Sequence, residues 1–240
     1  MLTSPGSDPM PSTTSADATV SRDPADNLKA ILARIEQARR AAIAPADTVQ
    51  LIGVTKTHAA ERILPVLMAG HRTFGENRVQ EANSKWPELR LRFPDIELHL
   101  IGPLQTNKVQ EAVALFDAIH SLDRPRLAQS LKTELEKSAR SLRLFVQVNT
   151  GEERQKAGIA PKEAVSFVRY CRDELHLPVI GLMCIPPVEE EPALHFALLK
   201  KLADAAELRC LSMGMSEDFE TAIRFGATHV RIGTALFGPR

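Results

Sequence analysis

The chain has 240 residues, of which 44% are hydrophobic and 25% charged, proportions typical of a globular protein with a sizeable core. Thirty basic residues balance thirty acidic ones, so no overall field attracts nucleic acid or an anionic membrane surface. No run approaches the roughly 18 apolar residues of a membrane-spanning helix.

The N-terminal residues differ in composition from the rest of the chain. Residues 1–22 are rich in Ser, Thr, Pro and Ala and have almost no large side chains to bury, so we expect a disordered tail. They lack the apolar core of a signal peptide, and two aspartates argue against a transit peptide. The folded domain is expected over residues 23–240, opening with Asp23 as an N-cap and Pro24 in the first helical turn.

From residue 49 onward, short β-rich runs alternate with amphipathic helical stretches. The expected strands span residues 49–54, 73–74, 98–101, 118–121, 144–148, 179–184, 208–212 and 229–232. The expected helices span residues 63–69, 79–91, 109–115, 126–139, 162–174, 193–206 and 217–225. Pro65 interrupts the first of these helices, so the pattern does not define where that helix begins and ends.

Regular alternation of strand and helix predicts a parallel sheet, because parallel neighbours are joined by crossover helices. About eight such repeats favour a closed (β/α)8 TIM barrel over an open doubly wound sheet. No linker-like segment interrupts the series, so we expect a single domain after the tail.

The cysteines and histidines indicate whether disulfide bonds or a metal site are to be expected. Cys171, Cys184 and Cys210 are widely spaced and lie in apolar surroundings, which indicates buried thiols in a reducing, cytoplasmic protein. The seven histidines show no spacing typical of metal ligands, so we expect no metal site. His99 is the histidine expected to face the barrel mouth.

The stretch VQLIGVTKTH places Lys56 just after the first expected strand. In barrels of this kind, catalytic and binding groups gather at the carboxyl ends of the strands. Lys56 is therefore a candidate site residue. A surface lysine, whose stem covers apolar atoms while its ammonium reaches water, could occupy the same position. The residues at the other strand ends must therefore show whether Lys56 belongs to a site.

The turn after the seventh strand suits an anion. In the segment LSMGMS, Gly214 allows close backbone approach, and Ser216 is a natural N-cap for the helix that follows. The amides at such a helix start favour a negative charge. A simple turn and cap is the alternative interpretation.

The turn after the eighth strand combines Arg231, Gly233 and Thr234. The loops after strands seven and eight are where TIM barrels commonly hold phosphate. With Lys56 at another strand end, the two turns predict a phosphorylated aldehyde that a lysine captures as a Schiff base. Pyridoxal 5′-phosphate fits this description.

Six motifs, VTKTH, FGENRVQEA, HLIGPLQTNK, GLMCIPP, LSMGMSEDFETAI and VRIGTALFG, resemble in order and spacing the pyridoxal-phosphate homeostasis protein family, also called YggS/PROSC-like. The resemblance covers residues 27–238. It implies an alanine-racemase-type barrel with the cofactor on Lys56 and with Asn77 near the ring. It places Arg231 by the pyridine nitrogen or the phosphate. The phosphate would be surrounded by Ser212, Gly214, Ser216, Gly233 and Thr234.

Two positions bear on how closely the sequence follows the family pattern. His58 stands where many members carry a second lysine, which puts any transfer role of that lysine in doubt. Lys156 matches another family lysine, and we favour its interpretation as a solvated loop charge. The chain is also expected to end without a basic tail, directly after the eighth strand and its turn.

A lysine-bound cofactor raises the question of catalysis. Racemisation needs two opposed acid/base groups, and the racemase relatives supply the second, a tyrosine, from a separate C-terminal domain. Tyr170 is the single tyrosine and falls in an expected outer helix. We therefore expect a monomeric carrier that exchanges pyridoxal phosphate with apo-enzymes. A weak racemase or other amino-acid enzyme, and a scaffold that the cofactor only stabilises, are the alternatives.

Overall fold

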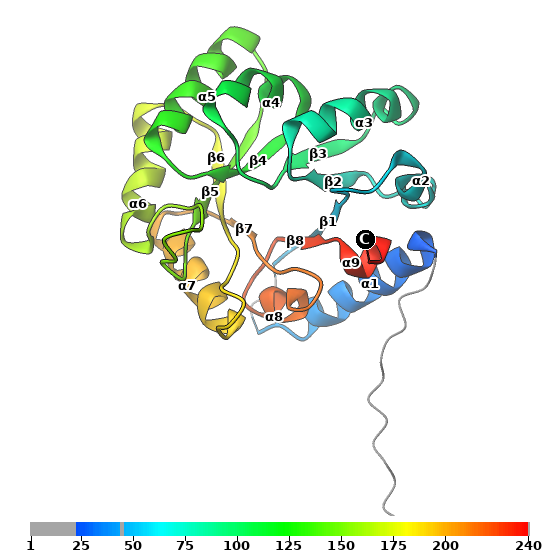
Figure 1. The fold of residues 1–240 in the computed structure, drawn as a ribbon. Helices are drawn as coiled ribbons and strands as arrows, with labels where there is room; N and C mark the ends of the chain where they lie inside the picture. Colours follow the sequence, from blue (N-terminus) through cyan, green and yellow to red (C-terminus); the bar gives the residue numbers. More distant parts are fainter. Residues whose placement is uncertain (1–22, 44–45, 240) are drawn as a thin grey trace, which may run out of the picture.

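The computed structural model describes residues 23–43 and 46–239, and within them eight strands close into a parallel barrel (Figure 1). Each strand pairs with its neighbours in sequence, and β8 pairs with β1. The predicted TIM barrel is therefore confirmed, while the expected tail over residues 1–22 lies outside the described residues. The strands are β1 Gln50–Val54, β2 Thr73–Glu76, β3 Glu97–Leu100, β4 Ala118–Leu122, β5 Arg143–Val148, β6 Val179–Cys184, β7 Cys210–Ser212 and β8 His229–Ile232.

Helices form an outer ring around the barrel (Figure 1). They are α1 Pro24–Arg40, α2 Ala60–Met68, α3 Val79–Arg92, α4 Val109–Leu115, α5 Pro125–Ser138, α6 Pro161–Arg169, α7 Pro192–Ala205, α8 Phe219–Arg224 and α9 Thr234–Phe237. Two short helical segments, η1 Thr106–Lys108 and η2 Tyr170–Glu174, adjoin α4 and α6. The helix expected over 162–174 thus changes to a π-helical turn at Tyr170. Pro65 lies inside α2, which begins before the expected start at residue 63.

α1 begins as its sequence predicts. The Asp23 carboxylate accepts a hydrogen bond from the Ala25 amide at 2.9 Å, and Pro24 occupies the first turn. Leu28, Ile31 and Ile35 are buried on the side of α1 that packs against α8 and α9. α1 therefore closes the ring between the last helices and α2.

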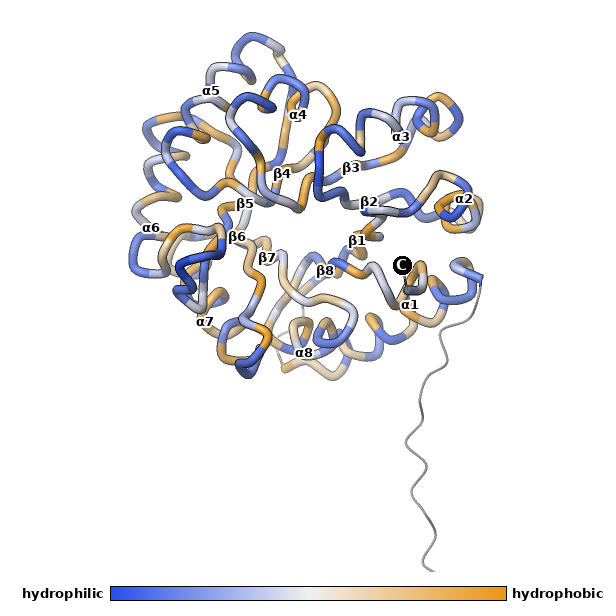
Figure 2. The backbone as a smooth tube through the Cα atoms, in the orientation of Figure 1, coloured by the Kyte–Doolittle hydropathy of each residue, from blue (hydrophilic) through white to orange (hydrophobic). Residues whose placement is uncertain are grey.

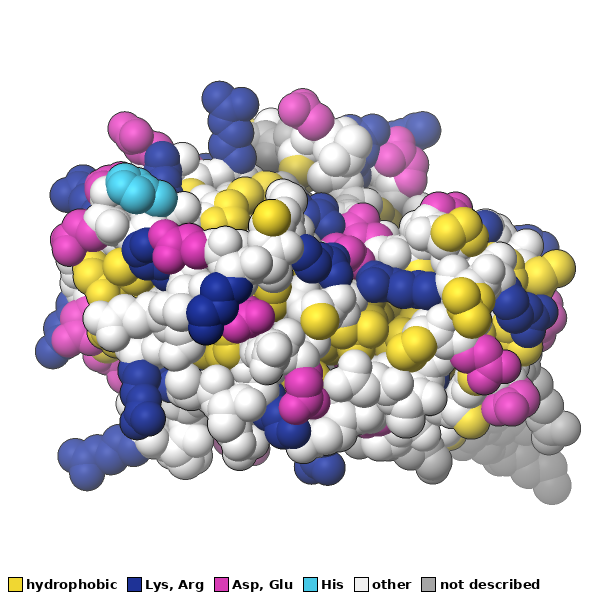
Figure 3. Space-filling view, turned by 90° about the horizontal axis from the view of Figure 1, so that it is seen from above, with side chains coloured by type: hydrophobic (Ala, Val, Ile, Leu, Met, Phe, Trp, Pro, Cys, Tyr) yellow, Lys and Arg dark blue, Asp and Glu magenta, His cyan; other side chains and the backbone are white. Residues whose placement is uncertain are grey.

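The helices of the ring are amphipathic. In Figure 2 their colour alternates between orange and blue along successive turns, as expected for helices with one face on the barrel. Lys and Arg side chains are interspersed with Asp and Glu over the face shown in Figure 3, in keeping with the balanced net charge. No helix in the described part of the chain is both long and apolar enough to span a membrane.

The three cysteine thiols are unpaired. Cys171 and Cys184 are buried and Cys210 is half-buried. Burial raises the pKa of Cys171 and of Cys184 to about 12, because a thiolate loses its hydration in apolar surroundings.

The barrel interior is polar where many TIM barrels are aliphatic. His99 of β3, His120 of β4 and His229 of β8 are all buried inside it. The His99 Nδ1 and His120 Nε2 atoms lie 2.9 Å apart, and His120 stacks on Phe145 with ring centroids 4.1 Å apart. The expectation that His99 faces the mouth is wrong, because strand alternation puts Ile101, two residues later, in the mouth position.

Charged groups close the amino-terminal end of the barrel. Glu97 receives hydrogen bonds from the His99 Nε2 atom at 2.5 Å, from Gln50 at 3.1 Å and from Arg143. Burial raises the pKa of Glu97, but the bonds from His99 and Arg143 outweigh burial and hold it at about 2. Burial lowers the pKa of His229 to about 3 and that of His120 well below its usual value. The interior histidines are therefore neutral at pH 7.

Replacing His229 tests whether the buried histidines are neutral in the folded protein. Its pKa is about 3 in the folded protein and 6.5 in the reference state, so the unfolded chain takes up the proton first as the pH falls. The contribution of His229 is complete above pH 6.5 and declines toward pH 3. Between pH 7 and pH 5, the wild type should lose about 2 kcal/mol more unfolding free energy than His229→Gln. Urea denaturation at both pH values measures this difference, and parallel losses in the two proteins would contradict it.

Candidate functional site

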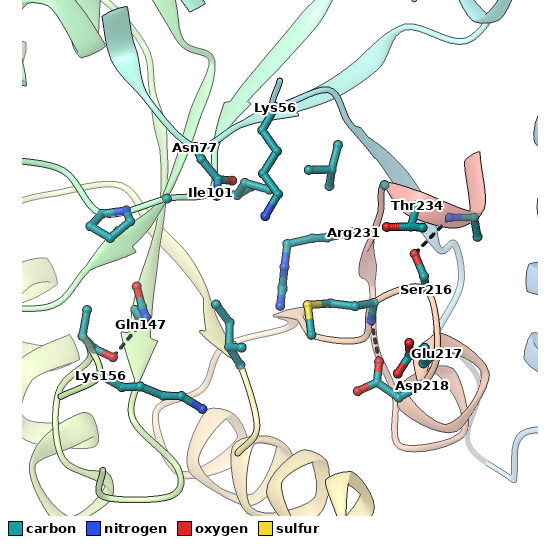
Figure 4. Close-up of a pocket in the computed structure, with 18 of the residues that line it drawn as sticks. Lys56, Asn77, Ile101, Gln147, Lys156, Ser216, Glu217, Asp218, Arg231 and Thr234 are labelled. Atoms are coloured by element: carbon teal, nitrogen blue, oxygen red, sulfur yellow. Dashed lines mark hydrogen bonds between the residues drawn. The ribbon is translucent and has the colours of Figure 1, made fainter. Parts of the chain in front are cut away.

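A cavity of about 1110 Å³ opens at the carboxyl ends of the strands. Residues after β1, β2, β3, β5, β6, β7 and β8 line it (Figure 4). It brings together six of the eight predicted site residues, namely Lys56, Asn77, Ser216, Arg231, Gly233 and Thr234. Ser212 and Gly214 contribute no surface to it and lie beneath and behind the lining residues.

Lys56 follows β1 by two residues, and its side chain extends into the cavity toward Arg231 (Figure 4). The backbone around it makes a tight turn in which the His58 amide donates to the Thr55 carbonyl at 3.1 Å. Thr57 has a φ of 66°, a left-handed conformation that is rare for a β-branched residue. The turn thus directs the ammonium inward, away from the surface position that a solvated lysine would take.

Two hydroxyls from neighbouring turns meet at one side of the cavity. Ser216, after β7, accepts a hydrogen bond from the Ala235 amide at 3.4 Å, and Thr234 opens α9 beside it (Figure 4). The expectation that Ser216 caps the following helix is wrong. α8 begins at Phe219 with Asp218 as its N-cap residue, because the Asp218 carboxylate accepts from the Met215 amide at 2.6 Å and closes an intervening turn.

Gly214 supports this turn from the far side. It has a φ of 92°, and a Cβ there would lie 2.6 Å from the Ala222 Cβ atom and 2.9 Å from the Phe219 Cα atom. Only glycine allows the turn to approach α8 so closely. Gly214 also accepts the Arg231 amide at 3.0 Å, which ties the β7 turn to β8.

Arg231 forms the floor of the cavity and is 4% exposed. Its guanidinium donates to the Ser212 hydroxyl at 2.7 Å and to the Cys184 carbonyl at 2.8 Å. Burial lowers the pKa of Arg231, yet a guanidinium remains charged in proteins. The side chain points toward β6 and β7, on the side of the barrel away from Thr234.

Ser212 links Arg231 to the interior histidines. Its hydroxyl oxygen lies 2.8 Å from the His120 Nδ1 atom. The ionised Glu97 carboxylate can only accept, so neutral His99 donates to it from Nε2 and accepts at Nδ1 from the His120 Nε2–H. The His120 Nδ1 atom is then an acceptor, and it receives the Ser212 proton. The hydrogen bonds therefore run in one direction, from the guanidinium at the floor to the carboxylate at the far end.

Asn77 enters the cavity from the end of β2, where a second close backbone approach holds it. A Cβ on Gly102 would lie 2.2 Å from the Asn77 carbonyl oxygen and 2.7 Å from its Cα atom. Glycine at position 102 is thus required for the turn after β3 to pack on Asn77.

The loop after β5 lines the remaining side of the cavity. Lys156 lies there, with its ammonium 3.2 Å from the Pro186 carbonyl oxygen and 2.5 Å from the Glu153 carboxylate. It is therefore a paired loop lysine at the cavity wall rather than a fully solvated charge. His58, which also lines the cavity, packs its ring against Phe237.

Sequence reasoning missed several lining residues. The largest group comes from β5 and its loop, Gln147, Asn149 and Gln155. Gln147 could have been found from the sequence, because it is a polar residue at an inward position of an otherwise apolar strand. In the structure its side-chain amide donates to the Ala157 carbonyl at 3.1 Å. Glu217 and Asp218 after β7 also line the cavity and were not predicted.

The donor set fits a small phosphorylated aromatic aldehyde. Ser216 and Thr234 offer hydroxyls where a phosphate would rest, Lys56 offers a primary amine, and Arg231 offers a fixed cation. Among residues 23–43 and 46–239, no three His, Cys, Asp or Glu side chains are grouped to hold a metal ion.

Comparisons with known proteins agree with this geometry. The family model described as "Alanine racemase, N-terminal domain" matches residues 27–240. A pyridoxal phosphate homeostasis protein of Pseudomonas aeruginosa is 41% identical over 223 residues, covering 90% of this chain and 95% of the relative. One from Escherichia coli strain K12 is 35% identical over 227 residues, covering 91% and 97%.

Solved structures also resemble this chain. PipY of Synechococcus elongatus, solved with PLP bound, is 36% identical with a TM-score of 0.77, covering 90% of this chain and 100% of PipY. Alanine racemase of Clostridium difficile shares the barrel fold at 16% identity and a TM-score of 0.68, and this chain spans 57% of its length. With its closed barrel and its match to the relatives over nearly their full length, the chain belongs to the pyridoxal phosphate homeostasis protein family.

Proposed function

We propose that this chain binds pyridoxal 5′-phosphate as a Schiff base on Lys56 and serves in its homeostasis and carriage rather than in catalysis. The observation that carries the proposal is the convergence of a strand-end amine, a buried cation and two hydroxyl-bearing turns on one cavity. The PLP-bound structure of the 36% identical PipY supports the choice of ligand.

Different residues of the cavity would contact different parts of the ligand. Ser216 and Thr234, with the amides around Gly233, would hold the phosphate, which is where TIM barrels commonly bind one. Asn77 would lie beside the ring. We assign Arg231 to the pyridine nitrogen, because its hydrogen bonds to Ser212 and Cys184 direct the guanidinium away from the Thr234 side.

When bound, the aldehyde offers an electrophilic carbon to a primary amine. The Lys56 amine would hold it by condensation, in which a C=N bond replaces the C=O bond and the oxygen leaves as water. A second amine condensing at the same carbon would release Lys56 as a free amine, which would make binding reversible. The cavity is large enough, at about 1110 Å³, to admit such an amine beside the cofactor.

Arg231 weakens the case for catalysis but does not separate a carrier from a racemase. It can only donate hydrogen bonds, so it cannot stabilise a protonated pyridine as a carboxylate would, and the racemases share this arrangement. The position of the tyrosine does favour a carrier. The single tyrosine, Tyr170, lies in η2 of the outer ring and bonds its hydroxyl to Gln129 at 3.1 Å. It therefore does not reach the cavity as the opposed acid/base group that racemisation requires.

The cellular location and oligomeric state are also part of the proposal. The free thiols support a reducing, cytoplasmic location. We propose a monomer whose open mouth exchanges cofactor with apo PLP-dependent enzymes.

The first test concerns which cavity lysine carries the cofactor. Lys56→Ala should abolish the imine absorption band of the protein mixed with pyridoxal 5′-phosphate, because the amine proposed to form the imine is removed. Lys156→Ala should retain the band, since its ammonium is already engaged by Glu153 and Pro186. Both variants should unfold within about 0.5 kcal/mol of the wild type. A band that survives in Lys56→Ala and disappears in Lys156→Ala would move the Schiff base to the other lysine.

The second test concerns carriage. The loaded protein should reactivate an apo PLP-dependent enzyme even in the presence of a scavenging amine that removes most of an equal amount of free cofactor. The physical reason is that cofactor bound in the cavity keeps the concentration of free aldehyde low, and the scavenger reacts fastest with the free aldehyde. Recovered enzyme activity is the readout. Equal losses for free and protein-bound cofactor would contradict the carrier function.

The third test concerns catalysis. Loaded protein incubated with L- or D-alanine in deuterated water should exchange the Cα proton far more slowly than about 1 s⁻¹, the lower end of ordinary turnover, because Tyr170, the single tyrosine, lies in the outer ring and not at the cavity. Proton NMR follows the loss of the Cα signal. Exchange at enzyme-like rates would instead establish the racemase alternative.

A further inference from the structure

A buried lysine lies directly behind the turn that carries Lys56. Lys85 belongs to α3 and its side chain is 8% exposed. Its ammonium donates to the Thr55 carbonyl at 2.8 Å and to the His58 carbonyl at 2.9 Å. These carbonyls belong to the residue immediately before Lys56 and to the second residue after it. The Lys85 ammonium is therefore hydrogen-bonded to the backbone on both sides of Lys56.

Glu76, at the end of β2, anchors this ammonium. Its Oε1 atom lies 2.8 Å from the Lys85 ammonium and also accepts from the Thr55 hydroxyl at 2.7 Å and the Trp86 indole at 2.9 Å. Glu76 is fully buried. The carboxylate therefore fixes both the lysine and the first residue of the turn.

Glu81, one helical turn before Lys85, holds the middle of the same turn. Its Oε1 atom accepts the Thr57 amide at 2.5 Å and lies 3.5 Å from the Lys85 ammonium. Thr57 adopts the left-handed conformation, which costs a non-glycine residue on the order of 1–2 kcal/mol. The bond to Glu81 stabilises the chain in that conformation.

We propose that Lys85, together with Glu76 and Glu81, positions Lys56 for condensation with the aldehyde. The inference rests on the proposed Schiff base at Lys56 and adds a set of positioning residues outside the cavity. Thr55, Thr57 and His58 are each bonded to this set, and the residue they surround projects into the cavity. An ammonium at the Lys85 position is required because only a multiple donor can satisfy two carbonyls and a carboxylate together.

A purely structural role for the cluster is the competing explanation. Buried ion pairs contribute little net stability compared with well-packed apolar residues, so stability alone gives no reason for a charged group here. A structural role also predicts that every ligand of the cavity weakens together when Lys85 is replaced. A positioning role predicts a loss confined to ligands that react with Lys56.

Two ligands separate these explanations. Pyridoxal 5′-phosphate can condense with an amine, whereas 4′-deoxypyridoxine 5′-phosphate carries a methyl group in place of the aldehyde and can only use the phosphate and ring contacts. Calorimetric affinities for both are measured on the full-length protein. In the wild type, the aldehyde should bind more tightly than the analogue, and Lys56→Ala should remove that difference.

Lys85→Met should weaken binding of the aldehyde by about tenfold or more, because a misplaced Lys56 loses part of the effective molarity with which it meets the bound aldehyde. Its affinity for the deoxy analogue should stay within about twofold of the wild type. Glu81→Ala, which removes the acceptor for the Thr57 amide and leaves the Glu76 pair intact, should show the same selective loss. Lys132→Met, which breaks a surface ion pair with Glu136 on α5, should change neither affinity.

The outcomes are distinct. Equal weakening of both ligands, or no change in either, would overturn the positioning role of Lys85. If Lys85→Met does not fold, Glu81→Ala decides alone by the same criterion. If the wild type binds both ligands equally and Lys56→Ala has no effect, the Schiff base itself fails, and the proposed function falls with it.

Discussion

The buried guanidinium of Arg231 is the constraint on which the barrel interior depends. Its two hydrogen bonds go to a hydroxyl and a carbonyl, both neutral, so neither partner neutralises its charge. The one-way chain through Ser212, His120 and His99 leads to Glu97 at the opposite end. Each hydrogen bond polarises the next in a low-dielectric core. The polar interior thus lets a cation remain at the cavity floor with its donors in fixed directions.

The cavity is held between two such networks. Arg231 and its chain fix the floor, while the Lys85 cluster fixes the wall from which Lys56 projects. The phosphate side depends on backbone packing instead, because Gly214 allows the β7 turn to rest on α8. Lys56, Arg231 and the Ser216–Thr234 side, proposed as the reacting amine, the ring partner and the anion site, are therefore positioned by separate parts of the fold, an arrangement that would preorganise the cavity for a ligand.

Much of this could be predicted from sequence, for reasons that differ by residue. The strands are short apolar runs, and β6 and β8 begin and end where the pattern indicates. Lys56 and Thr234 come two residues after a strand and Arg231 lies near the end of β8, so the barrel topology alone brings them together. His99 was misplaced because periodicity gives the inward face of β3 but not the depth along the axis. The Lys85 cluster was not foreseen, since α3 reads as an ordinary charged helix until its packing against the turn after β1 is known.

Burial of the cysteines has a consequence for a protein that handles an electrophile. With the pKa of Cys171 and Cys184 at about 12, almost none of either thiol is ionised at neutral pH, and the thiolate is the nucleophilic form. Neither sulfur competes with the cavity amine by forming a hemithioacetal. The fold thus keeps its own soft nucleophiles inert toward the reactive carbonyl that it would accommodate.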